Sequence, residues 1–77
     1  MSALLKISKQ RLASNVKGRR AQFGFSQEEL AFRAGIDRTY ASQIERGVAN
    51  PSLSIICALA VALECEIENL LLENRPS

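Results

Sequence analysis

Apolar side chains recur every three or four residues along this chain, and no window alternates between apolar and polar residues as a half-buried strand would. Leu12, Val16 and Phe23 follow the helical spacing and predict a buried stripe. Arg20 fills the fourth position of that stripe. The pattern therefore predicts a first helix over about residues 8–22.

Cap residues and glycines divide the remaining sequence into four shorter helices. Ser26 and Glu29 form a capping-box pattern, in which each side chain can accept a hydrogen bond from the backbone of the other. Asp37 can cap the next helix, and Ser52, after Pro51, can cap the one that follows. We predict these helices over residues 27–34, 38–46, 53–63 and 66–72.

The two ends of the chain have weaker patterns. Leu4, Leu5 and Ile7 precede the first predicted helix, and they form either an extra turn of it or an arm that docks on the domain. Glu66 opens the last predicted helix where a small capping residue is more usual. Residues 75–77 are expected to form a tail.

These signals together predict an all-α fold of five helices in one domain. The chain has 77 residues, which is the size of one small domain, and 47% of them are hydrophobic. Structural zinc takes four ligands, mostly Cys and His, whereas this chain has two cysteines and no histidine. On a continuous helix, Cys57 and Cys65 would lie about 12 Å apart, which is too far for a disulfide. We therefore expect no metal, no cofactor and no disulfide.

The second and third predicted helices carry the clearest motif. Only residues 35–37 join them. Ala31 and Ala34 are small where two helices must approach closely. Ile36 and Ile44 are apolar where the second helix leans on the first. This spacing is that of a helix-turn-helix, which places its second helix in the major groove of DNA.

Five separated segments resemble, in order and spacing, the Cro and phage-repressor (XRE-like) type of helix-turn-helix domain. These segments are Ser-Gln-Glu-Glu-Leu-Ala at 26–31, Ala-Gly at 34–35, Ile-Glu-Arg-Gly at 44–47, Asn-Pro-Ser-Leu at 50–53 and Leu-Ala-x-Ala-Leu at 59–63. The resemblance implies one DNA-binding domain over residues 1–77. It places the helix-turn-helix at about 27–46, and the apolar pattern described below indicates a dimerisation region at about 53–72. Residues 37–42 resemble, within the family, the small controller proteins of restriction–modification systems.

The resemblance implies that the outward side chains of the helix at 38–46 contact DNA bases. Ala41 and Ile44 are expected to face inward and so fix which side is outward. The expected base-contacting residues are Arg38, Thr39, Ser42 and Gln43. Arg38 can donate two hydrogen bonds to guanine, and Gln43 can pair with adenine. The alternative is an ordinary polar helix face.

Four further residues are expected to contact DNA phosphates: Gln27, Tyr40, Arg46 and Asn50. Gln27 opens a helix whose free backbone N–H groups suit an anion. Tyr40 can pack its ring on the domain while its hydroxyl meets phosphate. Arg46 and Asn50 lie at and after the end of the recognition helix, in a loop that family members lay along the DNA backbone. Arg46 can alternatively complement the helix dipole alone.

Arg20 and Glu45 are expected to pair inside the domain. Arg20 lies on the predicted buried stripe, and Glu45 ends a helix otherwise suited to anions, so it should not face phosphate. In the phage repressors the matching residues form an internal ion pair. We therefore expect a structural ion pair, with Arg20 able to touch phosphate as well.

Charge is unevenly distributed along the chain. The net charge is +2, but residues 1–50 carry nine basic and four acidic residues, whereas residues 51–77 carry one basic and four acidic residues. A basic first two-thirds suits a polyanionic partner, and the plainer alternative is a solvated charged surface. The acidic end implies that only one face meets the polyanion.

The helix predicted over residues 53–63 is apolar nearly all round. One side can serve the core of the domain, through Leu53, Ile56, Leu59, Ala60 and Leu63. The other side is expected to form a two-fold interface with a second copy, through Ile55, Ala58, Val61, Ala62, Cys65 and Ile67. The alternatives are a tolerated patch of small side chains or a different protein partner.

Three classes of function follow from these patterns. The first is a homodimeric, sequence-specific regulator that binds a pseudo-palindromic operator in double-stranded DNA. The second is a protein-interaction module such as an antitoxin. The third, an enzyme, is disfavoured because the chain has no histidine to activate a cysteine and no glycine-rich phosphate loop. No apolar run is long enough to span a membrane. We thus expect a cytoplasmic protein without a small-molecule ligand.

Overall fold

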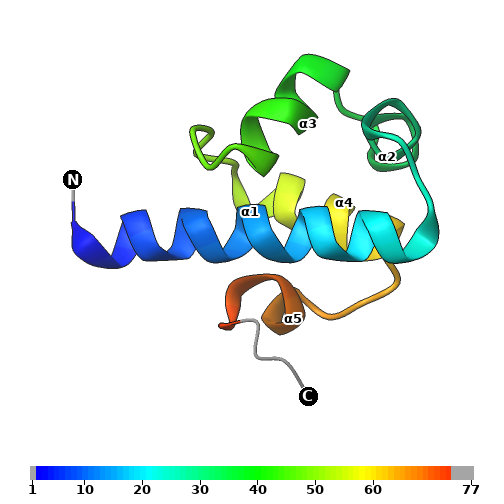
Figure 1. Ribbon diagram of the computed structural model, residues 1–77. Helices are drawn as coiled ribbons and strands as arrows, with labels where there is room; N and C mark the ends of the chain where they lie inside the picture. Colours follow the sequence, from blue (N-terminus) through cyan, green and yellow to red (C-terminus); the bar gives the residue numbers. More distant parts are fainter. Residues whose placement is uncertain (1, 74–77) are drawn as a thin grey trace.

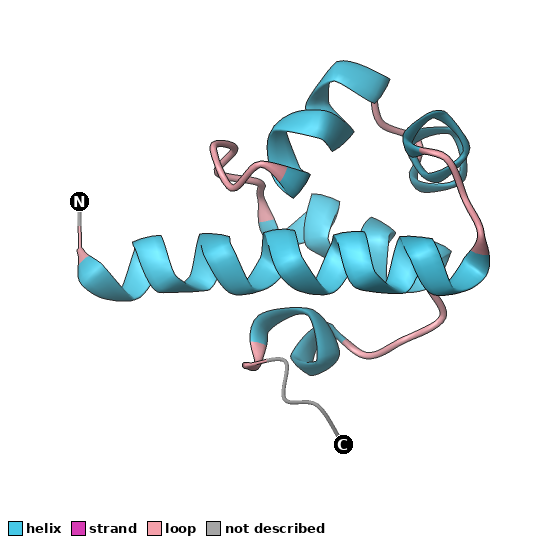
Figure 2. Cartoon of the chain, viewed as in Figure 1, coloured by secondary structure: helices cyan, strands magenta, loops and turns pink. Residues whose placement is uncertain are grey.

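The computed structural model describes residues 2–73, so the tail expected at 75–77 lies outside the described part. Residues 2–73 form helices and loops and no strand (Figure 2). The helices are α1 (Ala3–Phe23), α2 (Gln27–Ala34), α3 (Arg38–Glu45), α4 (Leu53–Ala62) and α5 (Ile67–Leu71). α1 runs across the molecule, with α3 and α5 on opposite sides of it (Figure 1). The predicted all-α, five-helix fold is confirmed.

α1 begins at Ala3, five residues before its predicted start. The hydroxyl oxygen of Ser2 caps it by accepting a hydrogen bond from the backbone N–H of Leu5 at 3.1 Å. Leu4 is 71% exposed. The apolar residues at this end therefore extend the helix and do not form a docked arm. The spacing of apolar residues could not reveal this extension, because these turns of α1 bury little of their surface.

The other helix boundaries lie within one residue of the predicted ones. Ser26 accepts from the N–H of Glu29 at 3.0 Å, which forms half of the predicted capping box. The Glu29 carboxylate does not return the bond but accepts from Arg33 Nε at 2.8 Å. Arg46 and Leu63, predicted as the last helical residues of α3 and α4, are instead the residues that cap them.

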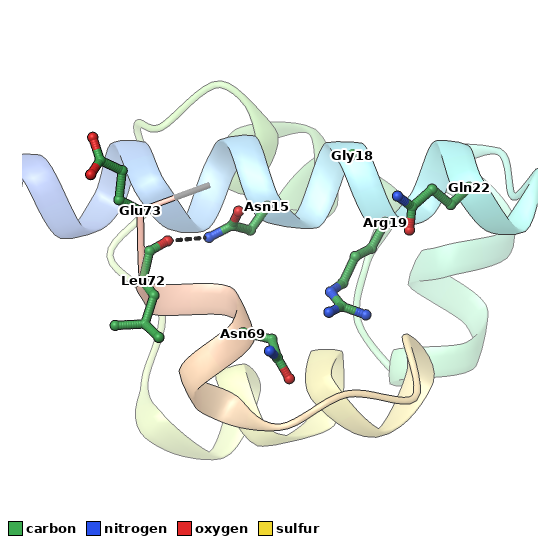
Figure 3. Close-up of a pocket in the computed structure, with 7 residues that line it drawn as sticks. All are labelled: Asn15, Gly18, Arg19, Gln22, Asn69, Leu72 and Glu73. Atoms are coloured by element: carbon green, nitrogen blue, oxygen red, sulfur yellow. Dashed lines mark hydrogen bonds between the residues drawn. The ribbon is translucent and has the colours of Figure 1, made fainter. Parts of the chain in front are cut away.

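A buried amide fastens the short helix α5 to α1. At the start of α5, the backbone N–H of Glu66 donates to Asn69 Oδ1 at 2.9 Å. At its end, Asn15 of α1, which is 6% exposed, donates through Nδ2 to the carbonyl oxygen of Leu70 at 2.9 Å. It also donates to that of Leu72 at 2.8 Å (Figure 3). These carbonyls have no partner within the helix, so the amide satisfies them. Sequence patterns gave no sign of this contact, which links residues 55 and 57 positions apart.

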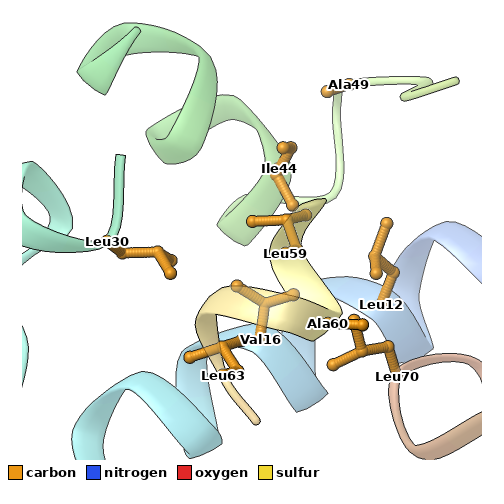
Figure 4. Close-up of a cluster of buried hydrophobic side chains, with 9 residues drawn as sticks. All are labelled: Leu12, Val16, Leu30, Ile44, Ala49, Leu59, Ala60, Leu63 and Leu70. Carbon is orange, nitrogen blue, oxygen red and sulfur yellow. The ribbon is translucent and has the colours of Figure 1, made fainter. Parts of the chain in front are cut away.

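The hydrophobic core joins all five helices through Leu12, Val16, Leu30, Ile44, Ala49, Leu59, Ala60, Leu63 and Leu70 (Figure 4). Two predictions about buried residues were wrong. Phe23 is 40% exposed, because it lies at the end of α1, past the core, where its ring stacks on Phe25. Leu53 is 66% exposed, because it is rotated by about 120° from the buried Leu59 around the axis of α4.

Candidate nucleic-acid interface

α2 and α3 form a helix-turn-helix that is packed on the core. Gly35 ends α2 in the left-handed conformation, with φ 70°, which costs a glycine little. The backbone N–H of Ile36 then donates to the carbonyl of Ala31 at 2.9 Å and closes the turn. Asp37 caps α3 by accepting from the N–H of Thr39 at 3.0 Å. The turn therefore fixes the direction in which α3 leaves α2.

Burial on α3 separates an inner face from an outer face. Ala41 and Ile44 are 1% and 2% exposed, as predicted. Arg38 and Thr39 are exposed, and Ser42 and Gln43 are half-buried. Within residues 2–73 these four side chains make no hydrogen bond or ion pair with other side chains. The outer face thus offers free donors and acceptors along one side of the helix.

The residues expected to meet phosphate lie in different surroundings. Arg46 and Asn50 are exposed at the end of α3 and in the loop that follows. The ring of Tyr40 packs against the core. Gln27 is half-buried, and its Nε2 donates to Glu45 Oε1 at 3.2 Å. The side-chain amide of Gln27 is therefore already engaged inside the domain, a contact that sequence reasoning missed.

Arg20 and Glu45 form a two-pronged ion pair between α1 and α3. Arg20 Nε lies 2.6 Å from Glu45 Oε2, and Nη2 lies 3.0 Å from Oε1. Arg20 Nη1 also donates to the carbonyl oxygen of Phe25 at 2.8 Å. The Glu45 side chain is 3% exposed, and its hydrogen bond raises the pKa of the Arg20 guanidinium above the ordinary value. The pair holds the end of α3 against α1 and the loop before α2.

The apolar side of α4 differs in part from its prediction. Val61 is 79% exposed, and the exposed Leu53 flanks this side. The other residues expected at an interface are half-buried: Ile55, Ala58, Ala62, Cys65 and Ile67. Both cysteines are free thiols, and burial raises the pKa of Cys65. The strongly exposed apolar surface of α4 is therefore narrower than expected.

A hollow of about 370 Å³ lies between α1 and α5 (Figure 3). Arg19, Asn69 and other polar side chains line it. α5, which borders this hollow, and α3 lie on opposite sides of α1 (Figure 1). Residues 2–73 hold no group of three or more potential metal ligands from His, Cys, Asp and Glu. None of the helices described has the length and apolar character needed to cross a membrane.

Residues 16–70, which include α2, α3 and α4, match the family model HTH_3, described as helix-turn-helix. The chain belongs to this family. This confirms the resemblance to Cro and phage-repressor domains that the five sequence segments indicated.

The relatives of this HTH_3 chain include transcription regulators and controller proteins. A hypothetical transcription factor from Neisseria meningitidis serogroup B is 48% identical over 61 residues, which are 79% of this chain and 58% of that protein. The chain thus spans less than two-thirds of the length of that relative. The crystal structure of the restriction–modification controller protein C.AhdI from Aeromonas hydrophila is 40% identical, with a TM-score of 0.77 over 80% of this chain and 94% of that one.

A third similar structure is the tetramer of the controller protein C.Esp1396I in complex with its natural 35-base-pair operator. It is 32% identical to this chain, with a TM-score of 0.72, and the match covers 86% of this chain and 82% of that one. The chain is therefore a helix-turn-helix protein of the HTH_3 family, and transcription regulators and restriction–modification controller proteins are among its relatives.

Proposed function

We propose that this protein is a cytoplasmic, sequence-specific DNA-binding regulator that acts as a homodimer and not as an enzyme. The observation that carries the proposal is the outer face of α3, where four polar side chains are free of partners within the described residues. Because Ala41 and Ile44 are buried, this face has one fixed orientation. A rigid helix with such a face can enter the major groove of DNA and read base edges.

The proposed base-contacting residues are those on the outer face of α3: Arg38, Thr39, Ser42 and Gln43. Arg38, in the first turn, can donate two hydrogen bonds to the O6 and N7 atoms of guanine. Thr39 can place its methyl group against that of thymine, and Gln43 can pair with adenine. Ser42 can donate to or accept from any base.

Phosphate contacts flank this face and set its register on the duplex. Arg46 and Asn50 are exposed and can reach the DNA backbone directly. The ring of Tyr40 packs on the core, which leaves its hydroxyl for a phosphate. Because Glu45 engages the Gln27 amide, the backbone N–H groups at the start of α2 are the better donors there.

The dimer interface is proposed on α4, α5 and the loop between them, within residues 53–72. Val61 supplies the exposed centre of the apolar side. The half-buried residues Ile55, Ala58, Ala62, Cys65 and Ile67 supply its borders. A two-fold axis there sets two recognition helices on one side of the duplex, about 34–36 Å apart, and requires a pseudo-palindromic operator. C.Esp1396I, which binds its operator as a tetramer, supports assembly on DNA.

We further propose that the regulated genes belong to a restriction–modification system. The similarity to C.AhdI and C.Esp1396I, both restriction–modification controller proteins, supports this assignment. Neighbouring genes for a methyltransferase and an endonuclease are its expected genomic setting.

Selection of bound duplexes from a random library tests the proposed function. We expect an enriched pseudo-palindrome and, in mobility-shift titrations, resistance of that complex to competitor DNA. Binding should weaken steeply with salt, since about three phosphates per subunit give a slope of about −5 for log K against log salt in the dimer. Failure to enrich any sequence, together with a slope near zero, would make a protein-interaction module the better assignment.

A further inference from the structure

The N-terminal turns of α1 lie beside the loop that follows α3. In Figure 1 the blue half of α1 runs beneath this loop. A surface hollow of about 280 Å³ is lined by Lys6, Lys9 and Gln10 of α1 and by Arg46 and Gly47 of the loop. Three cations from two separate segments therefore border one hollow. We call these three, Lys6, Lys9 and Arg46, the basic cluster.

At Gly47 the loop after α3 passes α1 at ordinary van der Waals distance. The φ of Gly47 is 74°, a left-handed conformation that favours glycine. A side-chain carbon at this position would lie 3.9 Å from Cβ of Ala13 and 4.0 Å from the carbonyl oxygen of Lys9. A further hollow of about 70 Å³ is lined by Lys9 and Asn50 among others. Lys9 thus neighbours both loop residues that are proposed to contact phosphate.

No acidic side chain from the described residues neutralises the basic cluster. α1 carries six cations and no acid, and residues 46–63 also contain no acid. The ion pairs within residues 2–73 are Arg20 with Glu45 and Arg33 with Glu29, and neither involves the cluster. The cluster therefore presents an uncompensated positive charge next to the outer face of α3.

Lys6 lies just after the first turn of α1, where the helix dipole does not favour a cation, and Lys9 lies about one turn further along. The N-terminus of a helix carries a partial positive charge, so acids stabilise the first turns and cations destabilise them. The first turn of α1 has no acid, and Lys6 and Lys9 follow it closely. The same partial charge favours a bound anion. Helix stability thus does not account for Lys6, and a bound anion would be favoured at this end of α1.

We propose that Lys6 and Lys9, together with Arg46, form a second phosphate-binding site for the DNA backbone. This inference rests on the proposed function and adds α1 to the surface that contacts DNA. The site holds the strand that passes the loop after α3, on the opposite flank of the recognition helix from the start of α2. It contributes affinity without sequence preference, since phosphates are the same at every base pair.

The test compares salt dependence on a random-sequence duplex of 35 base pairs, the length of the C.Esp1396I operator. The double variant Lys6→Gln/Lys9→Gln should lose about one phosphate contact per subunit, which reduces the steepness of log K against log salt by about 0.9 per bound subunit. Lys6→Arg/Lys9→Arg keeps both charges and should keep the wild-type slope. Arg19→Gln removes a cation from the side of α1 that lines the hollow against α5, and should also keep it.

Two further readouts separate this site from a structural role and from base recognition. The melting temperature of the glutamine double variant should equal or exceed that of the wild type, because the changes remove cations from the positive end of α1. Its preference for a selected operator over the random duplex should be unchanged. A lower melting temperature or a loss of preference would each contradict the proposal.

The outcomes also distinguish a failure of the second phosphate site from a failure of the proposed DNA-binding function. If the wild type shows no salt-dependent binding to the random duplex, the proposed function and this site both fail. If the wild type binds steeply and the glutamine double variant has the same slope as Arg19→Gln, only the second phosphate site is wrong.

Discussion

The arginines of this domain lie in two kinds of surroundings, one inside the fold and one at the surface. Arg20 is bound on three sides, to both carboxylate oxygens of Glu45 and to the carbonyl of Phe25. Arg38 and Arg46 are exposed and have no partner of this kind within the described residues. A guanidinium that is already satisfied fixes the fold, whereas a free one can recognise an external acceptor.

Arg38→Ala should change base preference. The variant lacks the guanidinium that we propose to bind guanine, so we expect a loss of about 1–3 kcal/mol per half-site and a relaxed preference at one base pair. Arg46→Ala should instead weaken binding to all sequences about equally, because it removes a phosphate contact. Titrations with operator and random duplexes measure both effects. An equal loss on the two duplexes for Arg38→Ala would identify Arg38 as a phosphate-contacting residue.

Glu45→Gln should destabilise the fold although it preserves the shape of the side chain. The change weakens charge-assisted hydrogen bonds at a carboxylate that is 3% exposed, and we expect the free energy of unfolding to fall by about 1–3 kcal/mol. Glu29→Gln is the matched control, because its ion pair with Arg33 is about half exposed and should contribute less than about 0.5 kcal/mol. Thermal unfolding followed by circular dichroism compares the two variants. Equal losses of unfolding free energy would contradict the structural role of Glu45.

At the scale of the helices, alanine substitutions at two glycines with similar free space should have opposite effects on the stability of the protein. A methyl group added at Gly18, inside α1, or at Gly35, after α2, would meet no atom within 4 Å beyond its immediate backbone surroundings. Gly18→Ala should stabilise the protein by about 0.5–1 kcal/mol, because alanine favours the helix. Gly35→Ala should destabilise it by about 1–2 kcal/mol, because φ is 70° there. Chemical denaturation measures both, and stabilisation by Gly35→Ala would contradict the left-handed turn.

The ends of a helix could be predicted from the sequence alone where capping residues mark them locally. Ser26 before α2 and Asp37 before α3 are caps whose partners lie two or three residues away. The bonds of Asn15 to α5 could not be predicted in this way, because their partners are distant in sequence. The exposure of Phe23 also depends on where the core ends, and periodicity carries no information about that.

In the candidate nucleic-acid interface too, features with a local sequence pattern could be predicted, whereas contacts between distant residues could not. The outer face of α3 follows from the apolar positions of Ala41 and Ile44, so local pattern was sufficient. The hydrogen bond from Gln27 to Glu45 depends on how α2 packs against α3, and the approach of Lys9 to the loop after α3 depends on how α1 crosses the helix-turn-helix. These tertiary contacts have no local signature.

At the scale of the whole molecule, exposed apolar side chains should govern assembly. Val61→Asp would place two like charges near the proposed two-fold axis, while the 79% exposure of Val61 leaves the monomer fold intact. The variant should sediment as a monomer and lose specific DNA binding with an unaltered α3. Phe32→Asp is the matched control, because Phe32 is 82% exposed on α2 and should not affect sedimentation. A wild type that is monomeric in ultracentrifugation at tens of micromolar would instead favour a different protein partner.

α1 is fastened on both of its sides, to α3 by Arg20 and to α5 by Asn15. In the proposed dimer there is then no flexible hinge between the subunit interface and α3, so each subunit must move as one rigid body. The distance between the two half-sites is then fixed by the protein, and the DNA must supply any adjustment. One inserted base pair would rotate the half-sites by about 35° relative to each other. Such an operator must be underwound or bent to be bound, so half-site spacing becomes part of the recognised sequence.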